Sequence, residues 1–138
     1  MREILILKID ELKEHEDIRP AYLEELKNQI MLDGILKMPI AVDEETYVIL
    51  DGHHRLQALK RLGCTKIPVV LVDYQSPEIK VLAQREGETI TKEMVIHMGL
   101  SGKKMPPKTS RHMVLMNGEF HHISMIEIFV NIPLEKLR

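Results

Sequence analysis

Residues 48–63 read VILDGHHRLQALKRLG, and this stretch contains the transition that decides the fold. The apolar run before Asp51 is typical of a buried strand, whereas the leucines of residues 56–62 recur every three positions, as in a helix that ends at Gly63. A strand end that leads into a helix leaves backbone N–H groups pointing outward at the positive end of the helix dipole. We therefore predict an anion-binding turn at DGHHR, residues 51–55.

Strand and helix patterns alternate on both sides of this turn, which predicts an α/β fold with a small mixed sheet and flanking helices. We expect strands at residues 4–9, 38–42, 46–50 and 66–74, and helices at residues 22–34, 52–63, 76–87 and 91–102. Ser76 and Thr91 are the predicted N-caps of the last two helices. The alternation in the tail, residues 121–137, suggests a closing strand and a terminal turn.

Length and composition favour a single domain that spans residues 1–138, because 44% apolar residues suffice for one core and no compositional break divides the chain. No long apolar run suggests a membrane span, and the acidic start is unlike a signal peptide, so we expect a cytoplasmic protein. Cys64 is the single cysteine, and we interpret it as a buried filler of the core.

The charge is distributed unevenly along the chain although the formal net charge is only −2. Residues 1–51 carry 13 acids and 6 bases, while residues 52–138 carry 8 acids and 13 bases. The segment KKMPPKTSRH, residues 103–112, has four fixed positive charges, no acid and two prolines that exclude a regular helix. This asymmetry suits an anionic ligand held by the second half, or a fold in which the two halves pair with each other.

Within the turn, Gly52 allows a phosphate to approach closely, and His53, His54 and Arg55 can add hydrogen-bond donors. Asp51 is negative where a phosphate would lie, so it suits a magnesium ion, a hydroxyl group, or the orientation of the neighbouring histidine and arginine side chains. The alternative is structural: Asp51 caps the helix and the histidines are ordinary surface residues. Adjacent histidines on a helix point about 100° apart, so a shared transition metal is not expected.

Three separated motifs resemble the ParB/sulfiredoxin-like superfamily, whose members bind nucleotide phosphates at this turn. VILDGHHRLQALKRLG followed by IPVVLVDY is most similar to the free-serine kinase branch, in which the turn reads Asp-Gly-His-His-Arg. KEHED, residues 13–17, resembles the branch's His-Glu segment, which implies that Glu16 is the catalytic base. PKTSRH resembles its Pro-Lys-Thr-Thr-Arg-His segment, which implies phosphate contacts from Lys108, Thr109, Arg111 and His112.

Departures from the superfamily narrow the expected function. Sulfiredoxin has a cysteine where this chain has His53, so peroxiredoxin repair is not expected. We also expect no DNA binding, because 138 residues leave no room for the helix-turn-helix domain of full ParB partition proteins. The segment between VDY and PKT, which partly lines the amino-acid pocket of the serine kinases, is shorter here.

Two hypotheses follow from these motifs. The first is a small phosphotransferase that uses Mg²⁺, held by Asp51, and moves a phosphoryl group from ADP or ATP to the hydroxyl of free serine or a similar small molecule. The second is a ParB-like nucleotide-binding module that acts as a switch without chemistry. Either one requires residues 51–55 and 106–112 to face the same cleft.

Overall fold

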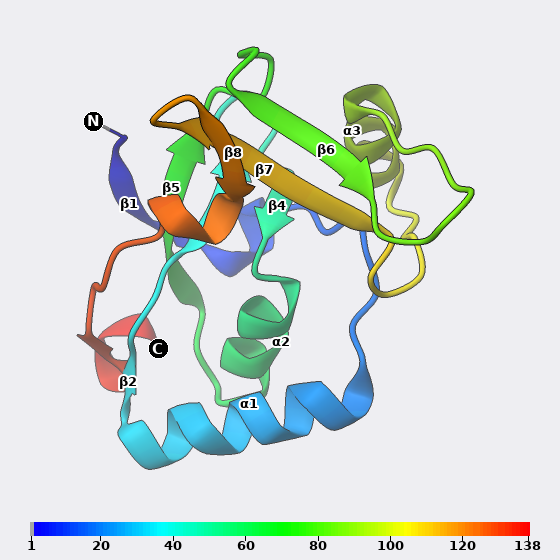
Figure 1. The fold of residues 1–138 in the computed structure, drawn as a ribbon. Helices are drawn as coiled ribbons and strands as arrows, with labels where there is room; N and C mark the ends of the chain where they lie inside the picture. Colours follow the sequence, from blue (N-terminus) through cyan, green and yellow to red (C-terminus); the bar gives the residue numbers. More distant parts are fainter. Residues whose placement is uncertain (1) are drawn as a thin grey trace.

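The computed structural model describes residues 2–138 and has the predicted mixed α/β architecture (Figure 1). In these residues the fold consists of three helices, several short 3₁₀ turns and three sheets. The helices are α1 (Pro20–Asp33), α2 (His53–Arg61) and α3 (Lys92–Ser101). The strands are β1 (Ile4–Lys8), β2 (Ile35–Leu36), β3 (Ile40–Asp43), β4 (Ile49–Asp51), β5 (Lys66–Val72), β6 (Ile79–Ala83), β7 (Ser110–Met116), β8 (Glu119–His122) and β9 (Ile132–Pro133).

The central sheet has the strand order β1-β5-β3-β4 and mixes both strand directions. β3 and β5 run parallel, while β1 and β4 are antiparallel to their neighbours. Strands β3 and β5 carry runs of fully buried apolar residues, as expected for strands that are covered on both faces. The sheet therefore separates two hydrophobic layers.

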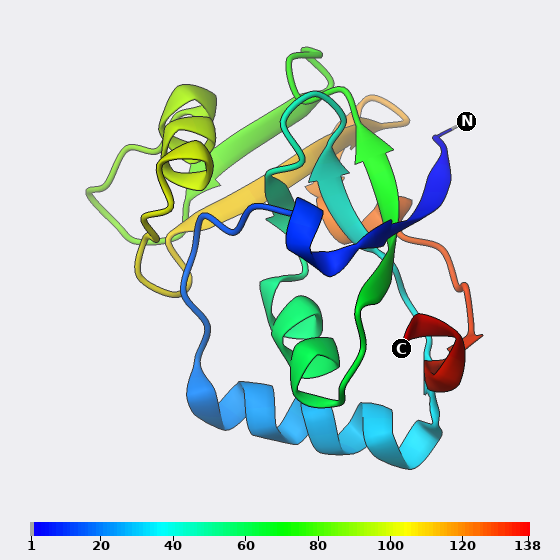
Figure 2. The same ribbon diagram turned by 180° about the vertical axis from the view of Figure 1, so that it is seen from behind.

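One layer packs α1 and α2 against the sheet, and the other lies between the sheet and the β6-β7-β8 unit with α3 (Figure 2). Leu56 and Leu59 of α2 are buried in the first layer, as the three-residue spacing predicts. Cys64 is buried in the same layer, in agreement with its interpretation as a filler. Among residues 2–138, no helix combines the length and the apolar character needed to cross a membrane.

The prediction of a helix over residues 76–87 is wrong, because this segment contains strand β6. Lys80 and Leu82 are exposed while Ile79 is buried, which is the period of a strand, and the whole of β6 pairs antiparallel with β7. Ser76 therefore caps no helix, whereas Thr91 caps α3 as predicted, through its side chain and the Met94 N–H.

The tail agrees with its prediction only in part. Strand β8 (Glu119–His122) includes only the first two residues of the predicted segment 121–137, and a 3₁₀ helix follows it over Ile123–Ile126. The chain then forms the short strand β9, which pairs with β2, and a terminal 3₁₀ turn over Leu134–Leu137. This path returns Leu134 and Leu137 to the hydrophobic layer that contains α1 and α2, and it brings Glu127 into the interior.

Candidate nucleotide site

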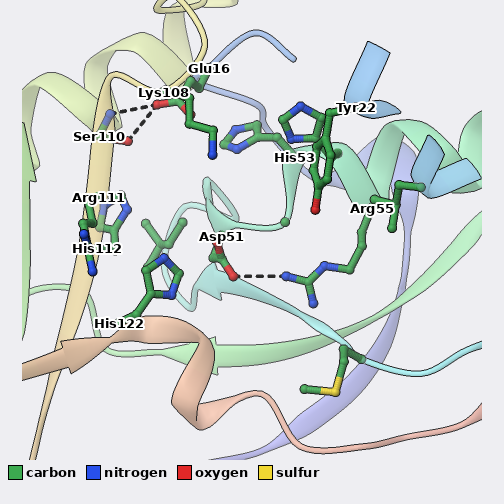
Figure 3. A pocket seen from close by; sticks show the side chains of 15 residues that line it. Glu16, Tyr22, Asp51, His53, Arg55, Lys108, Ser110, Arg111, His112 and His122 are labelled. Atoms are coloured by element: carbon green, nitrogen blue, oxygen red, sulfur yellow. Dashed lines mark hydrogen bonds and ion pairs between the residues drawn. The ribbon is translucent and has the colours of Figure 1, made fainter. Parts of the chain in front are cut away.

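A pocket of about 330 Å³ opens where the β4–α2 turn faces the start of β7 (Figure 3). Its volume lies in the usual range of small-molecule sites. The lining comes from α1 and the segment before it, from the β2–β3 connection, from β4 and the turn, and from β7, the loop before it and β8. The lining residues are Glu16, Tyr22, Leu26, Met38, Leu50, Asp51, Gly52, His53, His54, Arg55, Lys108, Ser110, Arg111, His112 and His122. The prediction that residues 51–55 and 106–112 face one cleft is thus confirmed for all of residues 51–55 and, in the second segment, for Lys108, Ser110, Arg111 and His112.

The turn has the backbone geometry of an open helix N-terminus. Gly52 is the N-cap of α2 and has φ +110°, and a Cβ atom added there would lie 2.2 Å from Cγ2 of Ile40. Within residues 2–138 no side chain caps the helix, so the idea that Asp51 acts as its cap is wrong. The first amides of α2 therefore lie at the pocket without a side-chain acceptor, which suits an anion.

Arg55 is fixed by the side chains of Asp51 and Glu127 rather than directed freely into the pocket. Its Nη2 lies 3.0 Å from Oδ2 of Asp51, its Nη1 lies 2.9 Å from Oε1 of Glu127, and Nη1 also donates to the Pro39 carbonyl. The Arg55 side chain is 18% exposed and that of Glu127 only 1%. Arg55 consequently anchors the turn to the C-terminal segment.

The two carboxyl groups beside Arg55 differ in their affinity for a proton. Burial, and then a hydrogen bond to Asp51, raise the pKa of Glu127 to about 9. Burial alone would raise the pKa of Asp51 too, but the hydrogen bond to Glu127 and the charge of Arg55 lower it. At neutral pH the pair therefore holds one proton, on Glu127, and Asp51 carries the negative charge.

His53 and His54 attach the segment before α1 to the first turn of α2. Nε2 of His53 accepts the backbone N–H of His15 at 3.1 Å, and Nε2 of His54 accepts that of Arg19 at 2.9 Å. Burial lowers the pKa of both histidines, which keeps these nitrogens unprotonated and able to accept. The paired histidines are therefore not ordinary surface residues, because they position the segment that carries Glu16.

Glu16 lies at the opposite wall and is held by the start of β7. Its Oε1 accepts hydrogen bonds from the N–H of Thr109 at 3.2 Å, the N–H of Ser110 at 2.9 Å and the hydroxyl of Ser110 at 3.0 Å. Backbone hydrogen bonds between Met105 and the chain on either side of Glu16 align the two segments. Within residues 2–138, Oε2 of Glu16 makes no hydrogen bond, so it is available to a ligand.

The basic loop contributes two cations and two residues with internal roles. Lys108 and Arg111 line the pocket and form no ion pair with any residue from 2 to 138. Thr109, a predicted phosphate contact, does not line the pocket, and its hydroxyl donates to the Pro106 carbonyl at 2.6 Å. His112 lines it but is buried, with its Nε2 2.8 Å from the Tyr74 hydroxyl, and burial lowers its pKa to about 3.

Several pocket residues were not predicted from the sequence: Tyr22, Ser110 and His122. Ser110 lies inside the PKTSRH segment, so this motif could have indicated that Ser110 belongs to the site. Glu127, which supports Arg55 from outside the pocket lining, belongs to no motif. Its role depends on a chain path that no local pattern predicts.

Comparison with known proteins identifies the family. Residues 1–86 match the model of the ParB N-terminal domain. The chain belongs to this family. The predicted resemblance is therefore confirmed, and the match ends before strand β7, which supplies the second wall of the pocket.

Curated relatives of this ParB-family chain include L-serine kinases. It is 36% identical over 83 residues to an "ATP-dependent L-serine kinase" from Staphylothermus marinus, a match that covers 57% of this chain and 33% of the relative. It is 32% identical over 83 residues to the "ADP-dependent L-serine kinase SerK" from Thermococcus kodakarensis, with 57% and 34% covered. The chain thus spans about a third of the length of the curated relatives that it matches.

Solved structures extend the likeness of fold to the whole chain. A free serine kinase in complex with AMP superposes with a TM-score of 0.80 at 18% identity, covering 98% of this chain and 93% of the other. A truncated SbnI from Staphylococcus aureus superposes with a TM-score of 0.72 at 15% identity, covering 98% and 89%. Strands β7 and β8, which lie outside the family match, are therefore part of a known fold.

Proposed function

We propose that this ParB-family chain transfers a phosphoryl group from ADP or ATP to the hydroxyl of free serine or of a similar small molecule. The observation that carries the proposal is the position of Glu16, whose carboxylate faces a pocket shared with an uncapped helix N-terminus and two unpaired cations. A carboxylate at this place would repel a phosphate but would suit a hydroxyl group that must lose a proton. A module that only binds nucleotide has no need for it.

The phosphate groups of the nucleotide would lie against the amides after Gly52, with Lys108 and Arg111 opposite. Phosphoryl transfer depends mainly on positioning and on neutralising charge, and these groups serve both purposes. Arg55 would act chiefly by holding Asp51 and the turn in place, because Asp51, Glu127 and Pro39 already occupy most of its guanidinium. His53 and His54 would act by keeping Glu16 in position.

A magnesium ion fits the pocket only in company with the nucleotide. Among residues 2–138 no group of three His, Cys, Asp or Glu side chains could hold a metal ion. Mg²⁺ in kinase sites typically uses one or two carboxylates together with phosphate oxygens and water, so the ionised Asp51 would suffice as its protein ligand. When bound, the ion would neutralise charge on the phosphates.

The acceptor hydroxyl would lie between Glu16 and the terminal phosphoryl group. Glu16 would take the hydroxyl proton through Oε2, while Oε1 stays fixed by the amides of Thr109 and Ser110. The two amides keep the carboxylate in one orientation before the substrate arrives, which reduces the ordering required in the transition state.

The test is a transfer assay with Mg²⁺, ATP or ADP, and a panel of hydroxy amino acids, with the products identified by mass spectrometry. Glu16→Gln retains an oxygen for the two amides but cannot accept the proton. We expect nucleotide binding to survive and transfer to fall by roughly a hundredfold or more. Asp17→Asn changes an exposed neighbouring acid outside the pocket and is the matched control.

The alternative of a non-catalytic nucleotide switch predicts a different result. In that case the wild-type chain binds nucleotide and phosphorylates no hydroxyl compound, and Glu16→Gln behaves like the wild type in both assays. This outcome would reject the kinase proposal and retain the nucleotide site.

A further inference from the structure

Ser110 places a hydroxyl group of the protein itself next to the proposed catalytic base. Its Oγ lies 3.0 Å from Oε1 of Glu16 and 3.0 Å from Nε2 of His15, and the residue lines the pocket. Figure 3 shows Ser110 beside Glu16 and Lys108, on the wall that faces the turn.

The hydrogen bonds of His15 determine whether its ring donates a proton to the Ser110 hydroxyl or accepts one from it. Nδ1 of His15 lies 2.8 Å from the carbonyl oxygen of Ile49, which can only accept, so Nδ1 carries the proton. Burial lowers the pKa of His15 to about 4, and the ring is therefore neutral with a lone pair on Nε2. Both neighbours of the Ser110 hydroxyl are thus proton acceptors.

Ser110 is only 9% exposed, but it borders the pocket and its oxygen keeps both lone pairs free for attack on a ligand there. Within residues 2–138 no group donates a hydrogen bond to Oγ, whose single proton has two acceptors. A nucleophile beside a base, with the base oriented by a third group, is the general pattern of activated hydroxyl nucleophiles. Here Glu16 and His15 are the bases, and the Ile49 carbonyl orients the imidazole.

We infer that Ser110 is a second phosphoryl acceptor, which the chain phosphorylates from its own bound nucleotide when no small-molecule acceptor occupies the pocket. The inference rests on the proposed function for the nucleotide and for Glu16. The Ser110 Oγ–P bond forms as the bond from the terminal phosphorus to its bridging oxygen breaks. ATP leaves as ADP, or ADP as AMP, and the hydroxyl proton passes to Glu16.

The pocket could hold a phosphate group on Ser110, and that phosphate would block the binding of a substrate. A phosphate on Ser110 could pair with the cations Lys108 and Arg111, which have no ion-pair partner within residues 2–138. It would also occupy the space beside Glu16 that a substrate hydroxyl needs. Phosphorylation of Ser110 should therefore compete with phosphorylation of free serine and should inhibit the modified chain.

The experiment uses the full chain with Mg²⁺ and ATP or ADP, without an acceptor, followed by mass measurement and peptide mapping. We expect a gain of one phosphoryl group on Ser110, stable to acid and labile to base as for phosphoserine. Added free serine should reduce the labelling. Ser110→Ala should lose the label, Ser110→Thr should carry it as phosphothreonine, and Ser101→Ala, an exposed serine outside the pocket, should label like the wild type.

Peptide mapping of the wild type shows whether Ser110 is phosphorylated even if Ser110→Ala fails to fold. If the chain phosphorylates free serine but never itself, Ser110 is not an acceptor and the kinase proposal stands. An acid-labile label on a pocket histidine, or a label on another residue, would also overturn the inference. A chain that binds nucleotide but phosphorylates neither free serine nor itself would overturn both proposals.

Discussion

The two walls of the pocket each contain an arginine, but the fold uses the two arginines differently. Arg55 of the turn is mostly buried and paired with Asp51 and Glu127, whereas Arg111 of β7 is exposed and has no ion-pair partner within residues 2–138. The charge of Arg55 is balanced within the folded chain, and the charge of Arg111 remains available to a ligand. A basic residue in a motif can therefore either contact the ligand or support the site. Whether it forms ion pairs within the folded chain distinguishes the two roles.

The largest effect that tests this difference is expected on stability. Arg55→Ala removes the cation between the buried Glu127 carboxyl group and the half-buried Asp51 carboxylate. Breaking a buried pair in this way costs about 3–5 kcal/mol of unfolding free energy. Denaturant unfolding of the variant and the wild type measures the loss. Arg61→Ala, exposed at the end of the same helix, should change stability by no more than about 0.5 kcal/mol. Equal losses in the two variants would show that the buried ion pair contributes nothing.

Arg111→Ala should weaken nucleotide binding and leave the stability of the chain unchanged. The exposed side chain supports no neighbour, so the unfolding free energy should stay within about 0.5 kcal/mol of the wild type. A charge-assisted hydrogen bond to phosphate is worth about 1.5–3 kcal/mol, so the Kd for nucleotide should rise by roughly tenfold to a hundredfold. Calorimetric titration with ADP, again with Arg61→Ala as control, measures the change. An unaltered Kd would remove Arg111 from the phosphate site.

The turn and its flanking elements could be predicted from the sequence because their patterns are local. Apolar runs and the three-residue leucine spacing correctly indicated β4, α2 and β5. The start SPE, in contrast, favoured a helix over residues 76–87, yet pairing with β7 about thirty residues later imposes a strand there. The residue patterns that indicate a helix start extend over only a few residues. They therefore contain no information about a strand partner that is distant in the sequence.

In the candidate site, too, the local motifs could be predicted from the sequence, whereas contacts between distant residues could not. The residues of the DGHHR and PKTSRH motifs lie at one pocket as expected, apart from Pro107 and Thr109. Glu127 could not have been found, because an acid inside the apolar run MIEIF carries no signal that it will meet Arg55 seventy-two residues earlier. The protonation of this pair is likewise a property of burial in the fold, which no motif encodes.

The smallest expected effect is a change in how stability depends on pH. Glu127 has a pKa of about 9 in the folded chain, above its ordinary value of 4.5, so the folded state binds the proton more tightly than the unfolded state does. Its stabilising contribution is therefore complete below about pH 4.5 and decreases as pH rises toward 9, with a slope of at most about 1.4 kcal/mol per pH unit. Asp51, with its lowered pKa, acts in the opposite sense and only at acid pH.

Glu127→Gln keeps the size of the side chain and a donor to Asp51 but cannot titrate. Unfolding free energies measured from about pH 6 to about pH 8 should fall with pH more steeply in the wild type than in this variant. The buried histidines titrate in the same way in both proteins, so the difference between the two slopes isolates Glu127. Glu135→Gln, an exposed acid near the C-terminus, should retain the wild-type slope. Parallel curves for wild type and Glu127→Gln would mean that Glu127 is ionised in the folded chain, and that both acids beside Arg55 carry charge.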